Sequence, residues 1–181
     1  QEPFECLVEI CAHDDLRTVL WPMPTDNDTD SWTLRAETWQ HPDVMLGGSD
    51  AGAHLDRMCG APYTTRFLGD CLRGRKLTTL EAAVKMLTDD PARLFGLRER
   101  GRITEGFHGD LVLFDPERVD AGKATLVHDL PGESPRLDSK AIGITAVWVN
   151  GVESIRGDVV TGAVPGKVLR SGRDTQTVST R

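Results

Sequence analysis

The chain has 181 residues, of which 39% are hydrophobic and 27% are charged, so it is large enough to bury a core as one ordinary domain or two small ones. Its formal net charge of -7 excludes the basic face that nucleic-acid binding requires. No apolar run reaches the length of a membrane-spanning helix, so no transmembrane segment is expected.

The first fifty residues alternate between helical and extended patterns. Apolar residues at helical spacing predict a helix over 4–12, and the short apolar run 17–24 predicts a strand. A polar loop then leads to a predicted helix that includes 34–40, and "VMLGG" at 44–48 is a second candidate strand. Such alternation is typical of βα units around a parallel sheet.

The clearest helical patterns follow. A helix is predicted around 64–74, and Thr78-Thr79-Leu80-Glu81 fits a capping box, in which a hydroxyl and a carboxylate bind the free amides of the first turn. The apolar stripe within 80–87 predicts the helix that this box would begin. Pro91 is expected to start a second short helix, and Gly96 stands where that helix would end.

After residue 98 the pattern changes to strands and turns. Strands are predicted over 110–114 and 144–149. Asn150-Gly151 is the preferred pair for a type I′ hairpin turn, so 152–155 is expected to pair back on the preceding strand. We therefore place a boundary near residue 98, between an α/β part and a small β part.

The histidines and cysteines form no metal-binding module at recognisable spacing. The four cysteines include no CxxC pair, which favours reduced thiols in a cytoplasmic protein over two disulfides. The acidic N-terminus also lacks the basic start and apolar centre of a signal peptide. Four histidines are interpreted as structural or surface residues: His13, His41, His108 and His128.

Asp50 stands out in "VMLGGSDAGAHL", residues 44–55, because an acid follows a strand-like run among small residues. Small neighbours let a substrate approach the backbone closely. At the carboxyl end of a strand, such an acid would face an active site. Spacing alone leaves another interpretation open, in which Ser49-Asp50 caps a helix or forms a local turn.

Four long stretches together resemble the C-terminal part of N-acyl-D-amino-acid deacylases, of the amidohydrolase superfamily. They are "GGSDAGAHLDRMCGAPYTTRFLG", "LTTLEAAVKMLTDDPARLFGLRERGRITEGFHGDLVLFDPE", "HDLPGESPRLDSKAIGITAVWVNGV" and "VPGKVLRSG". The resemblance implies an α/β fold, a metal-dependent TIM (β/α)8 barrel with a small β-sandwich beside it. Residues 1–98 would then be the C-terminal portion of the barrel, and 99–181 the sandwich strands with a C-terminal tail.

The resemblance also implies roles for particular residues. Asp50 matches an aspartate that follows the last barrel strand, and it would take a proton from the zinc-bound water and pass it to the leaving nitrogen. His54, Arg57 and Arg66 are candidates for binding substrate, the arginines through its α-carboxylate, although ordinary surface roles are the alternative for each. The family holds zinc with histidines that include a His-x-His pair, which this sequence lacks.

A complete barrel needs about 250 residues, so we expect a fragment of a longer enzyme, processed or trimmed before Gln1 and inactive alone, with no tightly bound metal. The expected activity of the complete enzyme is hydrolysis of the linear amide bond of N-acyl-D-amino acids. The alternatives are a cyclic-amide hydrolase of the same superfamily, or a non-catalytic module that associates through exposed edges. The expected partner is a small-molecule substrate, with no nucleic acid or membrane, and the sequence leaves a homo-oligomer open.

Overall fold

The computed structural model describes residues 2–18 and 25–178. They fall into two compact units, Gln1–Trp32 and Thr33–Arg181, which are described separately. The strand predicted over 17–24 lies almost entirely outside the described residues. Within them, no helix is both long and apolar enough to cross a bilayer.

The first unit is built around helix α1, Pro3–His13, which confirms the helix predicted over 4–12. Pro3 lies in the first turn, where its missing N–H would have no helical partner. The helix ends at Asp14, whose N–H donates to the carbonyl of Ile10. Large side chains of α1 remain exposed, among them Phe4 at 73%.

Helix α2, Thr29–Trp39, begins in the first unit and ends in the second. Asp28 precedes it, and its carboxylate accepts hydrogen bonds from the N–H (2.9 Å) and the hydroxyl (2.8 Å) of Ser31. These bonds lower the pKa of Asp28, because they stabilise its charged form. In the second unit the ring of Trp39 packs edge-on against Phe67, with ring centroids 5.4 Å apart.

Three short helices follow in the second unit, namely α3 (Tyr63–Gly69), α4 (Leu80–Leu87) and α5 (Asp89–Leu94). A π-helical turn, Asp70–Gly74, continues α3, so a helix around 64–74 is confirmed. The cap of α4 is the hydroxyl of Thr79, which accepts from Ala82 N–H at 3.2 Å. The predicted capping box is therefore wrong: the cap is one residue later than Thr78, and the third helical position is Ala82, which has no carboxylate to return a bond.

The four-stranded sheet is antiparallel, in the order β1-β6-β7-β8. Its strands are β1 (Leu111–Phe114), β6 (Ile144–Val149), β7 (Val152–Arg156) and β8 (Val159–Val160). Asn150 and Gly151 both have positive φ, 49° and 78°, as a type I′ turn requires. The predicted strands and their hairpin are confirmed.

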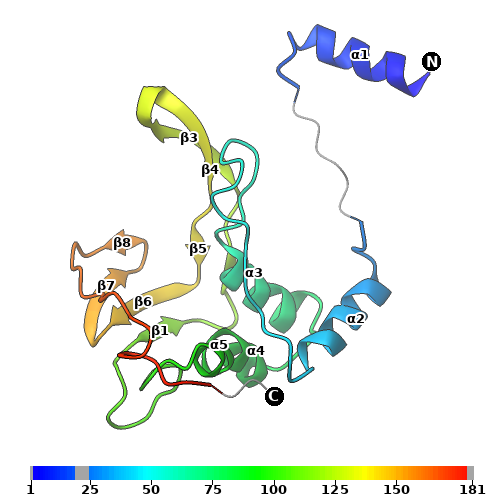
Figure 1. Ribbon diagram of the computed structural model, residues 1–181. Coiled ribbons are helices and arrows are strands. Elements are labelled where there is room, and N and C mark those ends of the chain that lie inside the picture. The colour runs from blue at the N-terminus through cyan, green and yellow to red at the C-terminus, as the bar shows by residue number, and fades with distance from the viewer. Residues whose placement is uncertain (1, 19–24, 179–181) are drawn as a thin grey trace. The chain divides into compact units, whose positions relative to one another are not determined.

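Two antiparallel ribbons connect β1 to β6. The short ribbon pairs β2 (Asp120–Ala121) with β5 (Ala141–Ile142). The longer ribbon pairs β3 (Thr125–Leu130) with β4 (Ser134–Asp138), and a 3₁₀ turn, Pro131–Glu133, joins the two strands. Figure 1 shows that the longer ribbon extends away from the helices α3 to α5.

The core lies where α3 and α4 meet the chain between β1 and β2. Its fully buried members are Ala83 and Val119, and Leu68 is almost fully buried. Arg73 joins the helices to the β part, because its guanidinium donates to the carbonyls of Pro116 (2.7 Å) and Val119 (2.5 Å). Partly buried hydrophobic residues surround this core: Phe67, Leu72, Leu87, Phe114 and Ile144.

One sequence expectation about the sheet is wrong for the described chain, and a second is not confirmed. Residues 44–48 form no strand but part of a loop, and every strand pair among the described residues is antiparallel, so no parallel barrel sheet is present there. The physical reason is that a strand needs a neighbour for its N–H and C=O groups, and no described strand lies beside 44–48. The domain boundary near residue 98 stays a prediction.

Candidate functional site

The candidate residues centre on the loop that connects α2 to α3. Part of it, residues 49–60, closes on itself and is called the 49–60 loop. A Cβ atom at Gly60 would overlap the carbonyl oxygen of Ser49, so the two ends of the loop touch and glycine is required there. A compact loop with its ends together is typical of functional surface loops.

Two backbone turns shape the interior of the 49–60 loop. Ala53 N–H donates to the carbonyl of Asp50 at 3.1 Å, and Met58 N–H donates to the carbonyl of His54 at 2.8 Å. Asp50 and His54 both have left-handed backbones, with φ of 53° and 47°. Aspartate and histidine are among the non-glycine residues that adopt this region most readily, so the two candidate residues occupy the bends of the loop.

Ser49, and not Asp50, forms the local side-chain turn. Its hydroxyl accepts a hydrogen bond from Ala51 N–H at 3.1 Å. The Asp50 side chain is exposed, and none of the hydrogen bonds or ion pairs identified in the described part of the chain uses its carboxylate. The local-turn alternative for Ser49-Asp50 is therefore observed, through the Ser49 hydroxyl and the backbone of Asp50, whereas the Asp50 side chain caps no described helix.

The two candidate arginines lie in different settings. Arg57 is in the 49–60 loop and contacts the neighbouring Asp56 at 3.3 Å. The hydrogen bond from Arg57 lowers the pKa of Asp56, and the positive potential of Arg57 and of His54 adds to this effect. Arg66 lies on α3 and is exposed. The fold thus places Asp50, His54 and Arg57 in one closed loop, and Arg66 on the helix that follows it.

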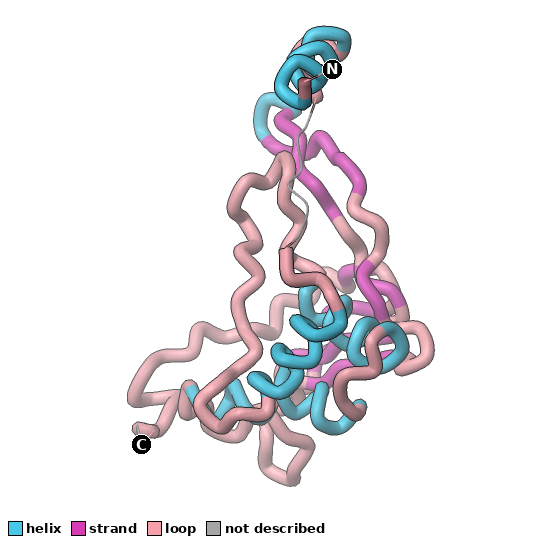
Figure 2. The backbone as a smooth tube through the Cα atoms, turned by 90° about the vertical axis from the view of Figure 1, so that its right-hand side faces the viewer, coloured by secondary structure: helices cyan, strands magenta, loops and turns pink. Residues whose placement is uncertain are grey.

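The tip of the 49–60 loop is attached to strand β4. Leu137 N–H donates to the carbonyl of Leu55 at 2.7 Å. In Figures 1 and 2 this part of the chain runs beside the β3–β4 ribbon in both views. This contact is not predictable from the sequence, because a backbone amide leaves no signal in residue type.

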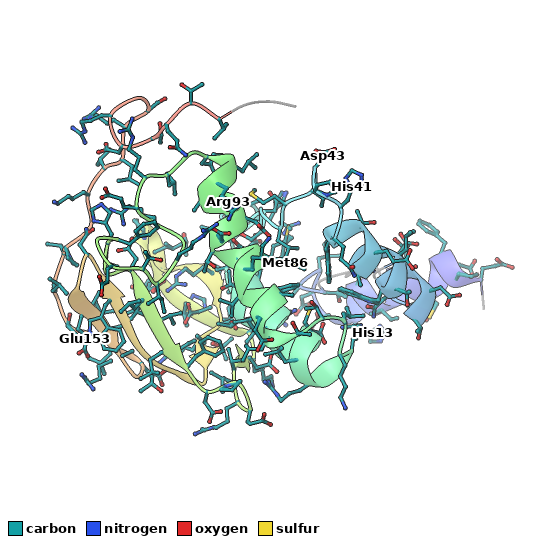
Figure 3. All side chains as sticks on the ribbon, turned by 90° about the horizontal axis from the view of Figure 1, so that it is seen from below. His13, His41, Asp43, Met86, Arg93 and Glu153 are labelled. Carbon is teal, nitrogen blue, oxygen red and sulfur yellow. The ribbon has the colours of Figure 1, made fainter. Side chains whose placement is uncertain are left out.

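The residues of this chain do not fit a zinc site. Zinc in proteins takes three or four ligands from histidine, cysteine and carboxylate side chains, and no group of three or more such residues gathers among the described residues. The residues outside the described ranges carry none of these side chains. Figure 3 shows His41 beside Asp43 in the turn after α2, with 3.8 Å between its Nδ1 atom and a carboxylate oxygen of Asp43.

The chain belongs to the amidohydrolase family, because the family's sequence model matches residues 4–155. It is 38% identical to N-acyl-D-glutamate deacylase from Alcaligenes xylosoxydans xylosoxydans, over 73% of this chain and 25% of that protein. It is also 39% identical to D-aminoacylase from the same organism, over 67% of this chain and 24% of that protein. The chain therefore spans about a quarter of the length of these relatives.

A solved structure supports the same family assignment. N-acyl-D-glutamate deacylase from Bordetella bronchiseptica, complexed with zinc and a phosphonate inhibitor that mimics the tetrahedral intermediate, matches with a TM-score of 0.54 and 36% identity. The match covers 80% of this chain and 28% of the deacylase. The family resemblance stated from the sequence is confirmed.

Proposed function

We propose that this chain forms the C-terminal part of a metal-dependent hydrolase that cleaves the amide bond of N-acyl-D-amino acids. The observation that carries the proposal is the 38% identity to N-acyl-D-glutamate deacylase over 73% of the chain. The names of the two relatives from Alcaligenes xylosoxydans xylosoxydans favour a linear amide over a cyclic one, because both describe the removal of an acyl group from an amino acid.

In this proposal Asp50 is the proton-transfer residue. Its carboxylate accepts a proton from the water whose oxygen adds to the amide carbon. It then returns that proton to the nitrogen as the C–N bond breaks, so the products are a carboxylic acid and a free amine. The support is that Asp50 lies at an exposed bend of a closed loop. The side chain of Ser49, and not that of Asp50, makes the local turn bond.

His54 and the two arginines are proposed to bind substrate. His54 occupies the second bend of the same loop and presents hydrogen-bonding nitrogens. A guanidinium matches the geometry of a carboxylate, so Arg66 on α3 suits the substrate's α-carboxylate. Arg57 would first have to leave Asp56.

The metal of the complete enzyme is proposed to be zinc, held by residues outside this chain. The support is the zinc in the Bordetella bronchiseptica deacylase together with the lack of a ligand cluster among the described residues. We therefore propose that the 181-residue chain is inactive by itself.

Asp50→Asn tests the proposal in the polypeptide encoded by the full reading frame. Loss of a general base typically costs about 10²–10⁴-fold in rate, so kcat for an N-acyl-D-amino acid should fall by that factor while zinc content stays unchanged. The measurement is amine release from matched N-acyl-D and N-acyl-L substrates, with zinc determined by mass spectrometry.

Asp43→Asn is the matched control, because it removes an exposed carboxylate from the same connection between α2 and α3 without releasing Arg57. It should keep kcat within about threefold, by analogy with ordinary surface substitutions. Undiminished turnover in Asp50→Asn would remove that residue from catalysis. Equal rates on D and L substrates, or no amide hydrolysis at all, would contradict the proposed substrate class.

A further inference from the structure

The β3–β4 ribbon has one edge that the 49–60 loop covers. An edge strand presents N–H and C=O groups that need partners, and at Leu137 the partner is the carbonyl of Leu55, 2.7 Å away. Pro135 stands two residues earlier in β4. Alternate residues of a strand point their amides to the same edge, so Leu137 supplies the donor on an edge where Pro135 has none.

An arginine joins the two strands of the ribbon. Arg136 lies on β4, and its guanidinium contacts both carboxylate oxygens of Asp129 on β3 at 2.7 Å. It also contacts Asp138 at 2.9 Å. Bidentate arginine–carboxylate pairs are among the strongest and most directional polar contacts, and this one ties the two strands together.

The base of the ribbon is joined to the core. Gly122 N–H donates to the carbonyl of Lys140 at 2.7 Å, which continues the ribbon into β2–β5. A Cβ atom at Gly69 of α3 would lie 2.8 Å from the Asp120 carboxylate carbon on β2, so helix and strand are in close contact there. A series of contacts through β2 and the ribbon therefore leads from α3 to the tip of the 49–60 loop.

The 49–60 loop thus has two attachments, and the candidate catalytic residues lie between them. Its ends meet at Ser49 and Gly60, and its far side is held at Leu55. Asp50 and His54 fall within that span, each at a left-handed bend. A loop held at both points has less freedom than one held only at its ends.

We propose that the β3–β4 ribbon positions the catalytic loop, and that the backbone amide of Leu137 is the positioning group. This inference rests on the proposed function for its link to catalysis, whereas the anchor itself is independent of any activity. Displacement of a catalytic group by about 1 Å can cost on the order of 10²-fold in rate, so loss of the anchor should lower kcat more than it changes KM.

Leu137→Pro removes the amide donor, and Leu137→Ala is the conservative variant that keeps it. In the 181-residue chain, hydrogen exchange should show faster amide exchange across 50–58 in Leu137→Pro, while β6 and β7 keep their protection. Leu137→Ala should keep the protection of the loop. In the full-length enzyme, Leu137→Pro should lower kcat about 10- to 100-fold with KM within about threefold. Leu137→Ala, which keeps the amide donor, should have the kcat of the wild type.

The outcomes separate this inference from the proposed function. If Leu137→Pro leaves loop exchange unchanged, the anchor does not hold the loop and the inference is overturned. If the variant unfolds the ribbon, hydrogen exchange of the Leu137 amide in the wild-type chain tests the anchor instead. Fast exchange of that amide would show that no anchor exists. A mobile loop with unaltered kcat would overturn the positioning role, and an enzyme without deacylase activity would count against the proposed function alone.

Discussion

Cys71 is the most buried thiol of the described chain, with 1% of its surface exposed. It lies in the π-helical turn after α3. Burial raises the pKa of Cys71 from its ordinary value of 9.0 to about 11, and the neighbouring carboxylate of Asp70 adds to the rise. The thiol therefore remains protonated and unreactive at neutral pH, in keeping with its place in the core.

This raised pKa predicts a loss of stability at alkaline pH. The unfolded chain releases the Cys71 proton near pH 9, whereas the folded chain keeps it to about pH 11. The contribution is fully present below pH 9 and is lost as the pH rises through that window. Urea denaturation at pH 8 and pH 10.5 should show a smaller decrease in unfolding free energy for Cys71→Ala than for wild type. Equal decreases in the two proteins would contradict the prediction.

At the scale of elements, the start of α4 shows how local chemistry sets a helix boundary. Thr79 has an extended backbone, ψ 162°, and its hydroxyl satisfies the amide of Ala82. The same helix presents Ala83 to the core with no exposed surface. Capping and burial thus both stabilise this helix, which is too short to be stable by itself.

Removal of the Thr79 hydroxyl should destabilise α4. Thr79→Ala is expected to cost about 1 kcal/mol in the free energy of unfolding, since an amide of the first turn loses its partner. Thr78→Ala removes the neighbouring hydroxyl and is the matched control, with an expected change under about 0.5 kcal/mol. Urea midpoints of both variants provide the measurement. A larger effect at Thr78 would mean that the cap is the residue named from the sequence.

At the scale of the whole molecule, two compact units carry different kinds of structure. The unit Gln1–Trp32 contains α1 and the start of α2, and α1 buries none of its residues. The unit Thr33–Arg181 contains the core and all the strands that the structure describes. Its C-terminal segment returns to the helices, because Gln176 N–H donates to the carbonyl of Gly96 at 2.8 Å and Leu97 pairs with Thr175.

The arrangement predicts that the 181-residue chain retains no zinc. Purified chain, exposed to zinc and then dialysed, should contain well below one ion per molecule by mass spectrometry, because a stable site needs three or four ligands together. Chain treated with a chelator provides the baseline, and its melting temperature should equal that of the zinc-exposed sample. One tightly held zinc per chain, with a raised melting temperature, would contradict the assignment of the ligands to other parts of the enzyme.

Several features of this protein are determined by its sequence alone, because they depend on neighbours along the chain. The stripe of Leu80, Ala83 and Val84 predicts α4, since side chains three and four apart share one helix face. Asn150-Gly151 predicts its hairpin because both residues tolerate positive φ. The four stretches that resemble N-acyl-D-amino-acid deacylases, one of which contains Asp50, are likewise patterns along the chain, and together they identify the family.

Other features depend on contacts between distant parts of the chain, which residue types do not encode. The run Val44–Leu46 has the composition of a strand, yet a strand forms only where another strand accepts its hydrogen bonds, and none lies beside it in the described structure. The bond from Leu137 to Leu55 joins two backbone groups that every non-proline residue possesses. Only the tertiary structure decides which of these groups form hydrogen bonds with each other. The bond from Leu137 to Leu55 attaches the loop that carries Asp50 to the ribbon.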